Sequence, residues 1–372
     1  MSGKLLINCI PLLTPLTGVG RYTYEICRQL SHISEIEFFY YYGYYSKKLL
    51  DISIDDKKNN LSSYLQKNPL IRKSVKSVLF ASSRILAPKF DIYWEPNFIP
   101  LPQIKTKHIV TSVHDFSFKH YRDFLPKERK EYFDKYFDER VKKSDCLICF
   151  SEHIKKEIKG MLKCCDSEIT VIPHGVRHDI FKVYDDYELD VGLPDKFILF
   201  VGSIEPRKNL VRLLKAYDSI DKSLKDEYKL VLAGFKGWEN REIMELINNN
   251  EQYINYLGYV SDSDLAKLYN KSSLFVFPSI YEGFGLPVLE AMACGTPVIT
   301  SDSSSLPEVG GDAAIYCDPY SIEDIADKIV KALNDSELRS RLREKGITHA
   351  KEFTWEKSAL KHIEVFNNLT LK

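Results

Sequence analysis

The stretch FVFPSIYEGFGLPVLEAMACGTPVITSDSSSLPEV, residues 275–309, decides how the second half of this chain is expected to fold. Its apolar start is followed by a glycine-rich turn, and a helical pattern then begins near Pro287 and stops at Gly295. Proline suits the first turn of a helix, and glycine suits the position just past its end. The stretch therefore predicts a buried strand, a turn, a helix and a second buried strand, which is the repeating unit of a parallel sheet.

The same alternation of short apolar runs and helical patterns extends over the whole chain and occurs twice. The predicted strands are 5–10, 37–42, 92–94, 108–113, 146–150 and 169–172 in the first half, and 197–201, 229–233, 253–257, 274–277, 297–300 and 314–316 in the second. Residues 176–195 are rich in Pro, Gly and Asp and are predicted to be a linker. The sequence therefore predicts an α/β protein with two Rossmann-like domains, 1–175 and 196–354, that face a central cleft.

Composition limits the classes of function. The 372 residues include 52 Lys+Arg and 52 Asp+Glu, so the chain has no overall positive charge that would attract nucleic acid. It has no run of about 20 apolar residues, so no membrane span is predicted. The eight cysteines are sparse and mostly lie in apolar runs, which indicates reduced thiols in the cytoplasm. Cys146 and Cys149 are accordingly predicted to pack in a buried strand rather than to bind a metal.

Ligands of open parallel sheets bind beyond the carboxyl ends of the strands, so functional residues are expected in the loops there. In the first such loop, TGVGRY, Gly18 and Gly20 permit close backbone approach, and the next helix offers free N–H groups to an anion. A tight strand-to-helix turn is the structural alternative. A dinucleotide fingerprint would need a third glycine at Thr23 and an acidic residue ending the second strand, where aromatic residues stand, so NAD is not expected.

The loop after residues 197–201, GSIEPRKNL, is predicted to bind a diphosphate. Gly202 and Ser203 follow the strand directly, and Arg207 and Lys208 precede a helix. An arginine can bind a phosphate with two parallel hydrogen bonds, and a lysine neutralises it as a point charge. Two ordinary surface cations at a helix start are the alternative.

Two glutamates eight positions apart, Glu282 and Glu290, mark the most informative loop. Glu282 is expected in the turn ahead of the helix and Glu290 one turn inside it, so both can face a ligand at the helix N-terminus. A glutamate suits ribose hydroxyls, because its two oxygens can accept a pair of hydrogen bonds. The partial positive charge of the helix end favours phosphate, and the amides expected there are those of Gly283, Phe284, Gly285 and Leu286. A solvated glutamate and a capping glutamate are the alternative.

Two histidines lie at the ends of predicted strands. His114, in TSVHDF, could orient a sugar hydroxyl or take part in proton transfer, because the pKa of histidine lies near neutrality. A structural histidine that caps the strand is the alternative. His174, in IPHGV, is interpreted as a linker residue.

Taken together, these motifs resemble the retaining family-4 glycosyltransferases of the GT-B fold. The resemblance spans nearly the whole chain and is carried by GVGRY, VHDF, VIPHGV, VGSIEPRKNL, LGYVSDSDL and residues 275–309. Within the family, GVGRY and GSIEPRKNL resemble bacterial transferases that build O-antigen and related polysaccharides, many of which use GDP-mannose. The resemblance also implies that the amphipathic segment 355–372 returns to the first domain.

The resemblance implies roles for the candidate residues in binding a nucleotide-diphosphate sugar. Arg207 and Lys208 would hold the diphosphate, and Glu290 would hold the ribose. Glu282 and the amides near Phe284 and Gly285 would bind the transferred sugar, and Gly18 and Gly20 would close over the diphosphate. His114 would contact the sugar near the acceptor. The backbone of Tyr259 and Val260 would contact the nucleobase. The resemblance thus marks His114, Glu282, Arg207 and Lys208 as the catalytic set.

Two positions depart from the family pattern. Many relatives carry Arg where Ser203 stands, so Arg207 and Lys208 are expected to bear more of the diphosphate charge. Relatives usually have Asn where His174 stands. The family mechanism is a front-face transfer with retention of the anomeric configuration, in which the leaving phosphate accepts the proton of the acceptor.

Asp262-Ser263-Asp264 mimics the D-x-D motif of metal-dependent glycosyltransferases. It lies between LGYVS and LAKLY, which makes it a helix start with Ser261 or Asp262 as the N-cap. Since Arg207 and Lys208 already supply positive charge, neither a metal nor another cofactor is expected.

Residues 61–90 carry six basic side chains and no acidic one, and the apolar positions share one helical face. Such a helix could contact the inner face of the plasma membrane, although a helix packed on the first domain is the alternative. The cysteine usage and this basic stretch predict a cytoplasmic protein that lies in part at the membrane surface. The resemblance implies that it moves mannose from GDP-mannose to a lipid-linked saccharide in O-antigen synthesis. The alternatives are a UDP-sugar-dependent transferase of the same fold and a non-catalytic sugar-nucleotide-binding partner in a polysaccharide assembly complex.

Overall fold

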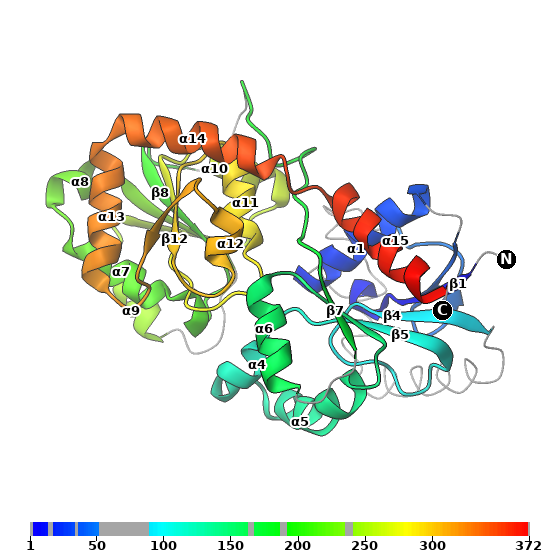
Figure 1. Cartoon of the computed structure of the whole chain (residues 1–372). Helices are drawn as coiled ribbons and strands as arrows, with labels where there is room; N and C mark the ends of the chain where they lie inside the picture. The colour runs from blue at the N-terminus through cyan, green and yellow to red at the C-terminus, as the bar shows by residue number, and fades with distance from the viewer. Residues whose placement is uncertain are drawn as a thin grey trace. The chain divides into compact units, whose positions relative to one another are not determined.

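The computed structural model describes residues 3–13, 18–33, 36–51, 89–162, 167–186, 192–234 and 241–370, which form two compact units (Figure 1). The first unit comprises Met1–Phe118, Leu125–His174 and Trp355–Lys372, and the second comprises Lys119–Phe124 and Gly175–Thr354. The stretch predicted as a linker begins on the second unit, where the N–H of Val176 donates to the carbonyl of Phe353 at 3.0 Å and Phe181 is buried.

A seven-stranded sheet in the order β3-β2-β1-β4-β5-β6-β7 forms the centre of the first unit. Every neighbouring pair is parallel except β2 with β3. The strands are β1 Lys4–Asn8, β2 Glu37–Tyr41, β3 Tyr45–Ser46, β4 Phe90–Glu95, β5 Thr106–Ser112, β6 Cys146–Cys149 and β7 Glu168–Val171. Six of them match predicted strands, whereas β3 was missed because two residues are too short to show an apolar pattern.

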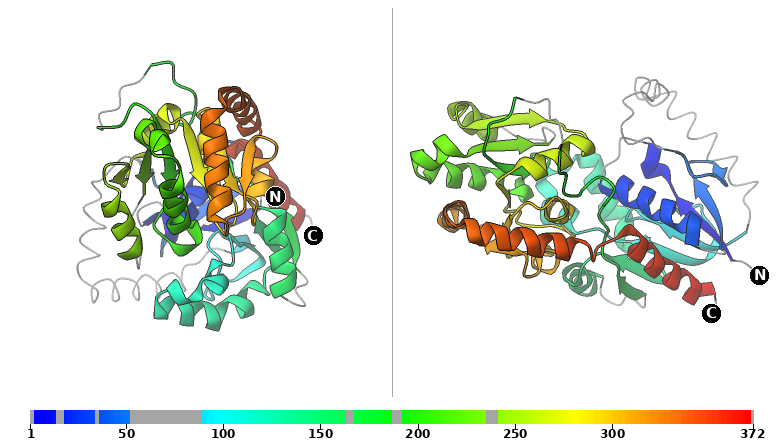
Figure 2. Two further views of the ribbon diagram at one scale, coloured as in Figure 1. Left: turned by 90° about the vertical axis from the view of Figure 1, so that its left-hand side faces the viewer. Right: turned by 90° about the horizontal axis from the view of Figure 1, so that it is seen from above.

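Helices cover this sheet, and the last helix of the chain packs beside the first. The helical elements of this unit are η1 Ile10–Leu13, α1 Gly18–Ile33, α5 Lys127–Val141, α6 Glu152–Met161 and α15 Trp355–Thr370. Of the two short elements between β5 and α5, α4 Ser117–His120 begins in the first unit, whereas η2 Arg122–Phe124 belongs to the second. Figures 1 and 2 both show α15 alongside α1, and α15 also packs against β4. The end of the chain therefore closes onto the domain in which the chain begins.

A buried chain of hydrogen bonds fixes α15 in this position. The indole N–H of Trp94 donates to Ser112 Oγ at 3.0 Å, and Ser112 Oγ lies 2.9 Å from the hydroxyl of Tyr22. That hydroxyl lies 2.7 Å from Nε2 of His362, and Nδ1 of the same ring lies 2.7 Å from the carbonyl of Ser358. Since a carbonyl can only accept, Nδ1 carries the proton and Nε2 accepts from Tyr22. Burial lowers the pKa of His362 to about 4, so the ring is neutral.

We expect His362→Leu to lower the free energy of unfolding at neutral pH by about 2–4 kcal/mol, because it leaves the buried Tyr22 hydroxyl without its acceptor. In the folded wild type the pKa of His362 lies below its ordinary value of 6.5, so as the pH falls this histidine is protonated in the unfolded chain before it is protonated in the folded one. The wild type therefore loses about 3 kcal/mol of this contribution between pH 6.5 and pH 4, and the variant does not. Denaturant unfolding at pH 7.5 and pH 4.5 measures both effects; a gap between the two proteins that grows toward acid would contradict this assignment.

The second unit contains a fully parallel six-stranded sheet in the order β10-β9-β8-β11-β12-β13. Its strands are β8 Phe197–Val201, β9 Lys229–Ala233, β10 Ile254–Gly258, β11 Leu274–Phe277, β12 Val298–Ser301 and β13 Ala314–Cys317. Each matches a predicted strand to within a residue or two. Most of their side chains are buried, as expected for a sheet covered on both faces.

The helices of the second unit follow its strands one by one. They are η3 Pro206–Lys208, α7 Leu210–Ser219, α8 Lys222–Glu227, α9 Arg241–Asn249, α10 Asp262–Lys271, α11 Leu286–Ala293, α12 Leu306–Gly310, α13 Ile322–Asn334 and α14 Ser336–Ala350. Among them, α7 packs with α13 and α11 packs with α14, and Figure 1 shows the labelled helices arranged around the sheet.

Each sheet has one place where the strand order reverses direction. In the first sheet it lies between β1 and β4, and in the second between β8 and β11. The loops that leave two such neighbouring strands run to opposite faces of the sheet and leave a crevice between them, which is where ligands of open α/β sheets bind. The topology therefore points to Gly202 and the turn before α11 in the second unit, and to Asn8 and Glu95 in the first.

Three further predictions can be compared with the structure. Cys146 and Cys149 are buried in β6 and neither is part of a disulfide, which confirms the interpretation as strand residues. Among the described residues no helix is long and apolar enough to cross a membrane. The basic stretch 61–90 lies outside the described residues except for its last two positions, so its contact with a membrane stays a prediction.

Candidate functional site

The turn between β11 and α11 is shaped by a glycine that lies against the first residue of α12. Gly285 adopts φ 111°, and a Cβ at this position would lie 2.6 Å from Cδ2 of Leu306. Glycine is favoured there because L side chains rarely adopt this backbone conformation, and a Cβ would also force the Leu306 side chain to move. Helix α11 starts at the next residue with Pro287 in its first turn, as the sequence predicts.

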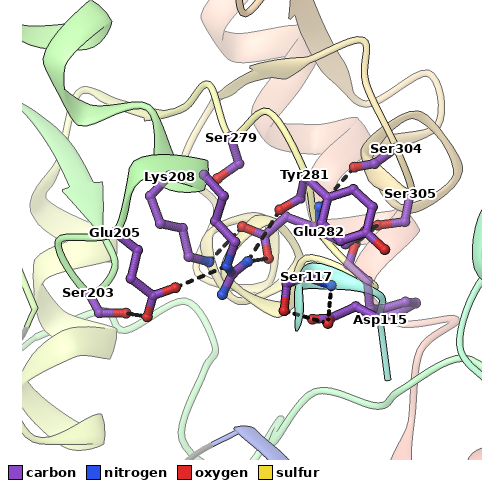
Figure 3. A network of polar contacts seen from close by, with 12 residues as sticks. Asp115, Ser117, Ser203, Glu205, Lys208, Ser279, Tyr281, Glu282, Ser304 and Ser305 are labelled. Atoms are coloured by element: carbon purple, nitrogen blue, oxygen red, sulfur yellow. Dashed lines mark hydrogen bonds and ion pairs between the residues drawn. The ribbon is translucent and has the colours of Figure 1, made fainter. Parts of the chain in front are cut away.

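Serines from the loop between β12 and α12 hold this turn. Ser304 Oγ accepts the N–H of Glu282 at 3.0 Å, and Ser305 Oγ donates to the carbonyls of Glu282 at 2.9 Å and Phe284 at 2.8 Å. Figure 3 shows Ser304 and Ser305 against the backbone of Glu282. These contacts fix the direction of the Glu282 side chain, and sequence reasoning assigned these serines no role.

Arg207, Lys208 and Glu282 form one charged cluster. Nη1 of Arg207 lies 2.8 Å from Oε2 of Glu282, and Nζ of Lys208 lies 2.6 Å from Oε1 (Figure 3). Arg207 also donates to the carbonyl of Tyr281 at 3.2 Å. Lys208 and Glu282 are each 7% exposed, so the pair is almost fully desolvated. The structure therefore brings together three of the four residues predicted to be catalytic.

The charges in this cluster set one another's pKa values. Burial would raise the pKa of Glu282, but the charges of Arg207 and Lys208 outweigh it and hold that pKa at about 2. Burial lowers the pKa of Lys208, with a further contribution from Arg207, although Glu282 works in the opposite direction. At neutral pH the carboxylate is thus ionised, and Arg207 lies where its guanidinium can also meet an anion.

Glu205 and Asn209 complete the cluster, although neither was assigned a function from the sequence. Glu205 accepts from Arg207 Nε at 3.0 Å and from Ser203 Oγ at 2.8 Å. Asn209 adopts φ 61° and donates to the carbonyls of Pro278 at 2.9 Å and Pro319 at 2.6 Å. The Ser203 hydroxyl thus orients Glu205.

Gly202 is held against the end of β9, and the residue that follows β9 is held in turn against the end of β10. Its N–H donates to the carbonyl of Ala233 at 2.9 Å, and the N–H of Gly234 donates to that of Gly258 at 2.7 Å. The predicted nucleobase residues Tyr259 and Val260 directly follow Gly258, with Tyr259 exposed. The predicted diphosphate and nucleobase loops therefore leave the same edge of the sheet.

Glu290 lies in the second turn of α11 and is 5% exposed. The sequence placed it one turn inside the helix, and the structure does so. The predicted amides of Gly283, Phe284, Gly285 and Leu286 precede it in the turn and at the helix start.

The remaining predicted site residues belong to the first unit. Gly18 and Gly20 form the first turn of α1. His114 follows β5, and its Nε2 lies 2.7 Å from the carbonyl of Pro96, so Nε2 carries a proton. Burial lowers the pKa of His114, although the Pro96 carbonyl and Asp115 work in the opposite direction, so the neutral ring is favoured.

The interpretation of His174 as a linker residue is wrong. This residue is buried, and its ring stacks on Phe150 with 3.9 Å between centroids and lies near Tyr22 and Trp355. Burial lowers its pKa well below the usual range. His174 therefore packs as a neutral aromatic ring in the core of the first unit.

The short segment Lys119–Phe124 contributes aromatic rings to the second unit. The ring of Tyr281, next to Glu282, lies 5.0 Å from that of His120 and 6.2 Å from that of Tyr121. This contact was not predicted, because the segment KHYRDF has no pattern that indicates a contact more than 150 positions away in the sequence.

The D-x-D mimic is a helix start. Ser261 is the N-cap of α10, and its hydroxyl oxygen accepts the N–H of Asp264 at 3.2 Å. Of the two caps predicted, Ser261 and Asp262, the structure therefore confirms the first. Asp262 lies 3.6 Å from Arg177. Across the described part of the chain, no cluster of three His, Cys, Asp or Glu side chains could hold a metal ion.

Comparison with known proteins gives consistent matches over both units. Residues 16–180 match the family described as Glycosyltransferase Family 4, and residues 188–349 match Glycosyl transferases group 1. The chain is 32% identical to O-antigen chain mannosyltransferase B of Escherichia coli, over 98% of this chain and 100% of that protein. It is 34% identical over 60% of its length to the serotype-specific mannosyltransferase WbdA of Escherichia coli, of which the match spans 27%.

Solved structures share the fold over the full length. Sucrose-phosphate synthase from Thermosynechococcus elongatus superposes with a TM-score of 0.76 at 19% identity over 100% of both chains. WaaG, a glycosyltransferase involved in lipopolysaccharide biosynthesis, superposes with a TM-score of 0.66 at 16% identity over 97% of this chain and 99% of that one.

Two parallel-sheet α/β domains, with a cluster of paired charges at the switch point of the second, define an enzyme of the GT-B fold. The chain belongs to the family-4 glycosyltransferases, with a group 1 domain as its second half, and it is a hexosyltransferase.

Proposed function

We propose that this enzyme transfers mannose from GDP-mannose to a lipid-linked saccharide during O-antigen assembly, with retention of the anomeric configuration. The choice of mannose and of O-antigen is supported by the 32% identity to an O-antigen chain mannosyltransferase over nearly the whole chain. Transfer takes place in the cytoplasm, at the membrane face where a lipid-linked acceptor lies. The donor binds the second unit and the acceptor the first.

The observation that carries the donor assignment is the cluster of Arg207 and Lys208 on Glu282. As the bond between sugar and phosphate breaks, negative charge grows on the diphosphate. Cations that Glu282 has already oriented stabilise that charge without further reorganisation, so they lower the energy of the transition state more than that of the bound donor. The same two cations supply the positive charge for which other glycosyltransferases use a metal.

His114 has a defined place in this scheme. Its Nε2–H is already bonded to Pro96, so the neutral ring meets the sugar through Nδ1, which accepts a hydrogen bond but cannot donate one. We therefore assign His114 to orienting a sugar hydroxyl by accepting its proton in a hydrogen bond. The leaving phosphate, rather than this ring, takes the proton of the acceptor.

A donor panel tests the proposal. We expect GDP-mannose to raise the melting temperature and to be slowly hydrolysed, with and without EDTA, whereas UDP-glucose, UDP-N-acetylglucosamine and UDP-galactose have no effect. Glu290→Ala should abolish the shift, because the ribose hydroxyls lose their bidentate acceptor. The matched control is Glu344→Ala on the exposed face of α14, which should behave as the wild type.

Each other result identifies what is wrong. A response to one UDP-sugar would replace GDP-mannose as the donor, and a response abolished by EDTA would contradict metal independence. No response to any nucleotide sugar would favour a non-catalytic partner. With a saccharide acceptor, NMR of the product should show the α-anomer of the donor retained, and an inverted product would refute the front-face mechanism.

A further inference from the structure

The first unit contains a pocket at the switch point of its own sheet. Asn8 ends β1 and Glu95 ends β4, the two neighbouring strands from which the chain runs in opposite directions. The pocket has a volume of about 330 Å³, within the range of small-molecule sites. Its lining comes from three segments: the loop after β1, the loop after β4, and the first two turns of α5.

The floor of this pocket is a buried carboxyl group. Glu95 is 1% exposed and accepts from Asn8 Nδ2 at 2.8 and 3.0 Å, from the Tyr93 hydroxyl at 2.5 Å and from the N–H of Asn97 at 3.0 Å. These donors are all neutral, unlike the cations that surround Glu282. Burial accordingly raises the pKa of Glu95 to about 8, although the same donors work in the opposite direction.

The wall of the pocket is aromatic, and its rim carries one cation. Phe133 is buried, whereas Tyr132 is 41% exposed, and both come from α5. The Arg129 guanidinium lies 5.7 Å from the centre of the Phe133 ring. The pocket thus combines an apolar face with polar groups on the floor and at the rim.

This combination selects for a class of ligand. A diphosphate is disfavoured because, in the part of the chain that the structure describes, the floor holds no cation and Arg129, at the rim, is the one cationic side chain that lines the pocket. A pyranose ring has an apolar C–H face that can pack on Tyr132 and hydroxyl groups that can reach Asn97 and Arg129. A neutral sugar therefore fits both the aromatic wall and the polar rim, whereas a purely apolar ligand would desolvate the Arg129 guanidinium without a hydrogen bond in return.

We propose that this pocket binds one neutral sugar unit of the acceptor glycan, held between Tyr132 and Arg129 on one side and Asn97 on the other. This assignment rests on the proposed function, since it takes the acceptor to be a saccharide. Glu95 is a positioning residue, because it orients Asn8 and the loop after β4 and itself has almost no exposed surface.

The loop after β4 connects the pocket to His114. Asn97 lies on the pocket side, and the carbonyl of the preceding residue, Pro96, binds the His114 ring. The Phe98 ring lies 5.2 Å from that of His114 and 5.6 Å from that of Phe133, which lines the pocket. A sugar in the pocket would therefore be one loop away from the histidine that we assign to the reacting sugar.

Steady-state kinetics with a mannose oligosaccharide as acceptor test the site. We expect Tyr132→Ala and Arg129→Ala each to raise the KM for the acceptor at least tenfold, with kcat changed less than threefold and the thermal shift by the nucleotide sugar unchanged. Tyr44→Ala is the control, because this tyrosine is similarly exposed, 46%, in the turn between β2 and β3 and does not line the pocket. An unchanged acceptor KM in both pocket variants would overturn the proposal.

A direct binding measurement separates failure of this proposal from failure of the proposed function. In saturation-transfer NMR without any donor, we expect methyl α-mannoside and a mannose disaccharide to receive signal from the wild type and from Tyr44→Ala but not from Tyr132→Ala. Displacement of the sugar by pyrophosphate would show an anion site instead and would overturn the assignment. A sugar signal that persists in Tyr132→Ala would also overturn it, whatever donor the enzyme uses.

Discussion

Lys208→Met is expected to lower kcat by roughly 10²–10³-fold, the loss typical of removing one preorganised group that stabilises charge in a transition state. Methionine keeps most of the volume of the side chain but removes the charge that lies 2.6 Å from Glu282 and, in our proposal, beside the diphosphate. The substitution also removes a charge-assisted hydrogen bond in a desolvated place, so the second unit should lose about 1.5–3 kcal/mol of stability. Donor turnover and denaturant unfolding measure the two effects.

A double substitution separates catalysis from stability. In Lys208→Met/Glu282→Gln the buried carboxylate is neutralised together with its partner, so much of the lost stability should return while kcat stays low. Lys215→Met is the matched control, because this lysine on α7 pairs with Glu242 on the exposed surface at 2.9 Å. Wild-type turnover in Lys208→Met would exclude Lys208 from the reaction.

Gly234→Ala is expected to destabilise the second unit by more than about 3 kcal/mol and to abolish donor binding. Gly234 adopts φ 146°, and a Cβ there would lie 1.9 Å from the carbonyl oxygen of Gly202, far inside van der Waals contact. Because the obstacle is backbone, it can yield only if the loop after β8 moves, and that loop carries Ser203 and leads to Arg207. The free energy of unfolding and the donor-induced thermal shift measure the two consequences.

Two other glycines serve as controls for this prediction. At Gly202 a Cβ would meet only side-chain atoms, at 3.5 Å or more, so Gly202→Ala should fold and should report on donor binding alone. Gly160 lies inside α6 with open space around it, so Gly160→Ala should gain about 0.5–1 kcal/mol from helix propensity. A Gly234→Ala protein as stable as the wild type would show that the two loops can separate without cost.

The predictions of secondary structure that rest on residues close together along the chain were confirmed by the structure. Residues 275–309 predicted β11, the turn and α11, because apolar runs, Pro287 and Gly295 act on their immediate neighbours. Ser261 as the cap of α10 follows from the same kind of rule, since an N-cap bonds a residue only three positions on. His174 failed for a related reason: the glycine and charged residues after it indicated a linker, while burial among aromatic rings from four other segments decided its place.

The residues that sequence reasoning missed act over long separations. Glu95 has no motif around it and becomes a candidate only when β1 and β4 pair and bring Asn8 against it, 87 positions away. The serines that hold Glu282 lie more than 20 positions beyond it, and Tyr281 packs on a segment that precedes it by 160 positions. No spacing rule covers such contacts, because they arise from the order of strands in a sheet.

By itself the sequence determined the fold class, the alternation of strands and helices, and the residue types suited to a nucleotide sugar. Periodicity, helix caps and family motifs all depend on residues that are close together along the chain. Only the tertiary structure decided that Arg207 and Lys208 share one carboxylate, that His114 is neutral with Nε2 already bonded, and that the first sheet carries its own polar pocket. The physical reason is that pKa values, desolvation and cavities depend on which groups lie within a few ångströms in space, and that is set by packing between segments far apart along the chain.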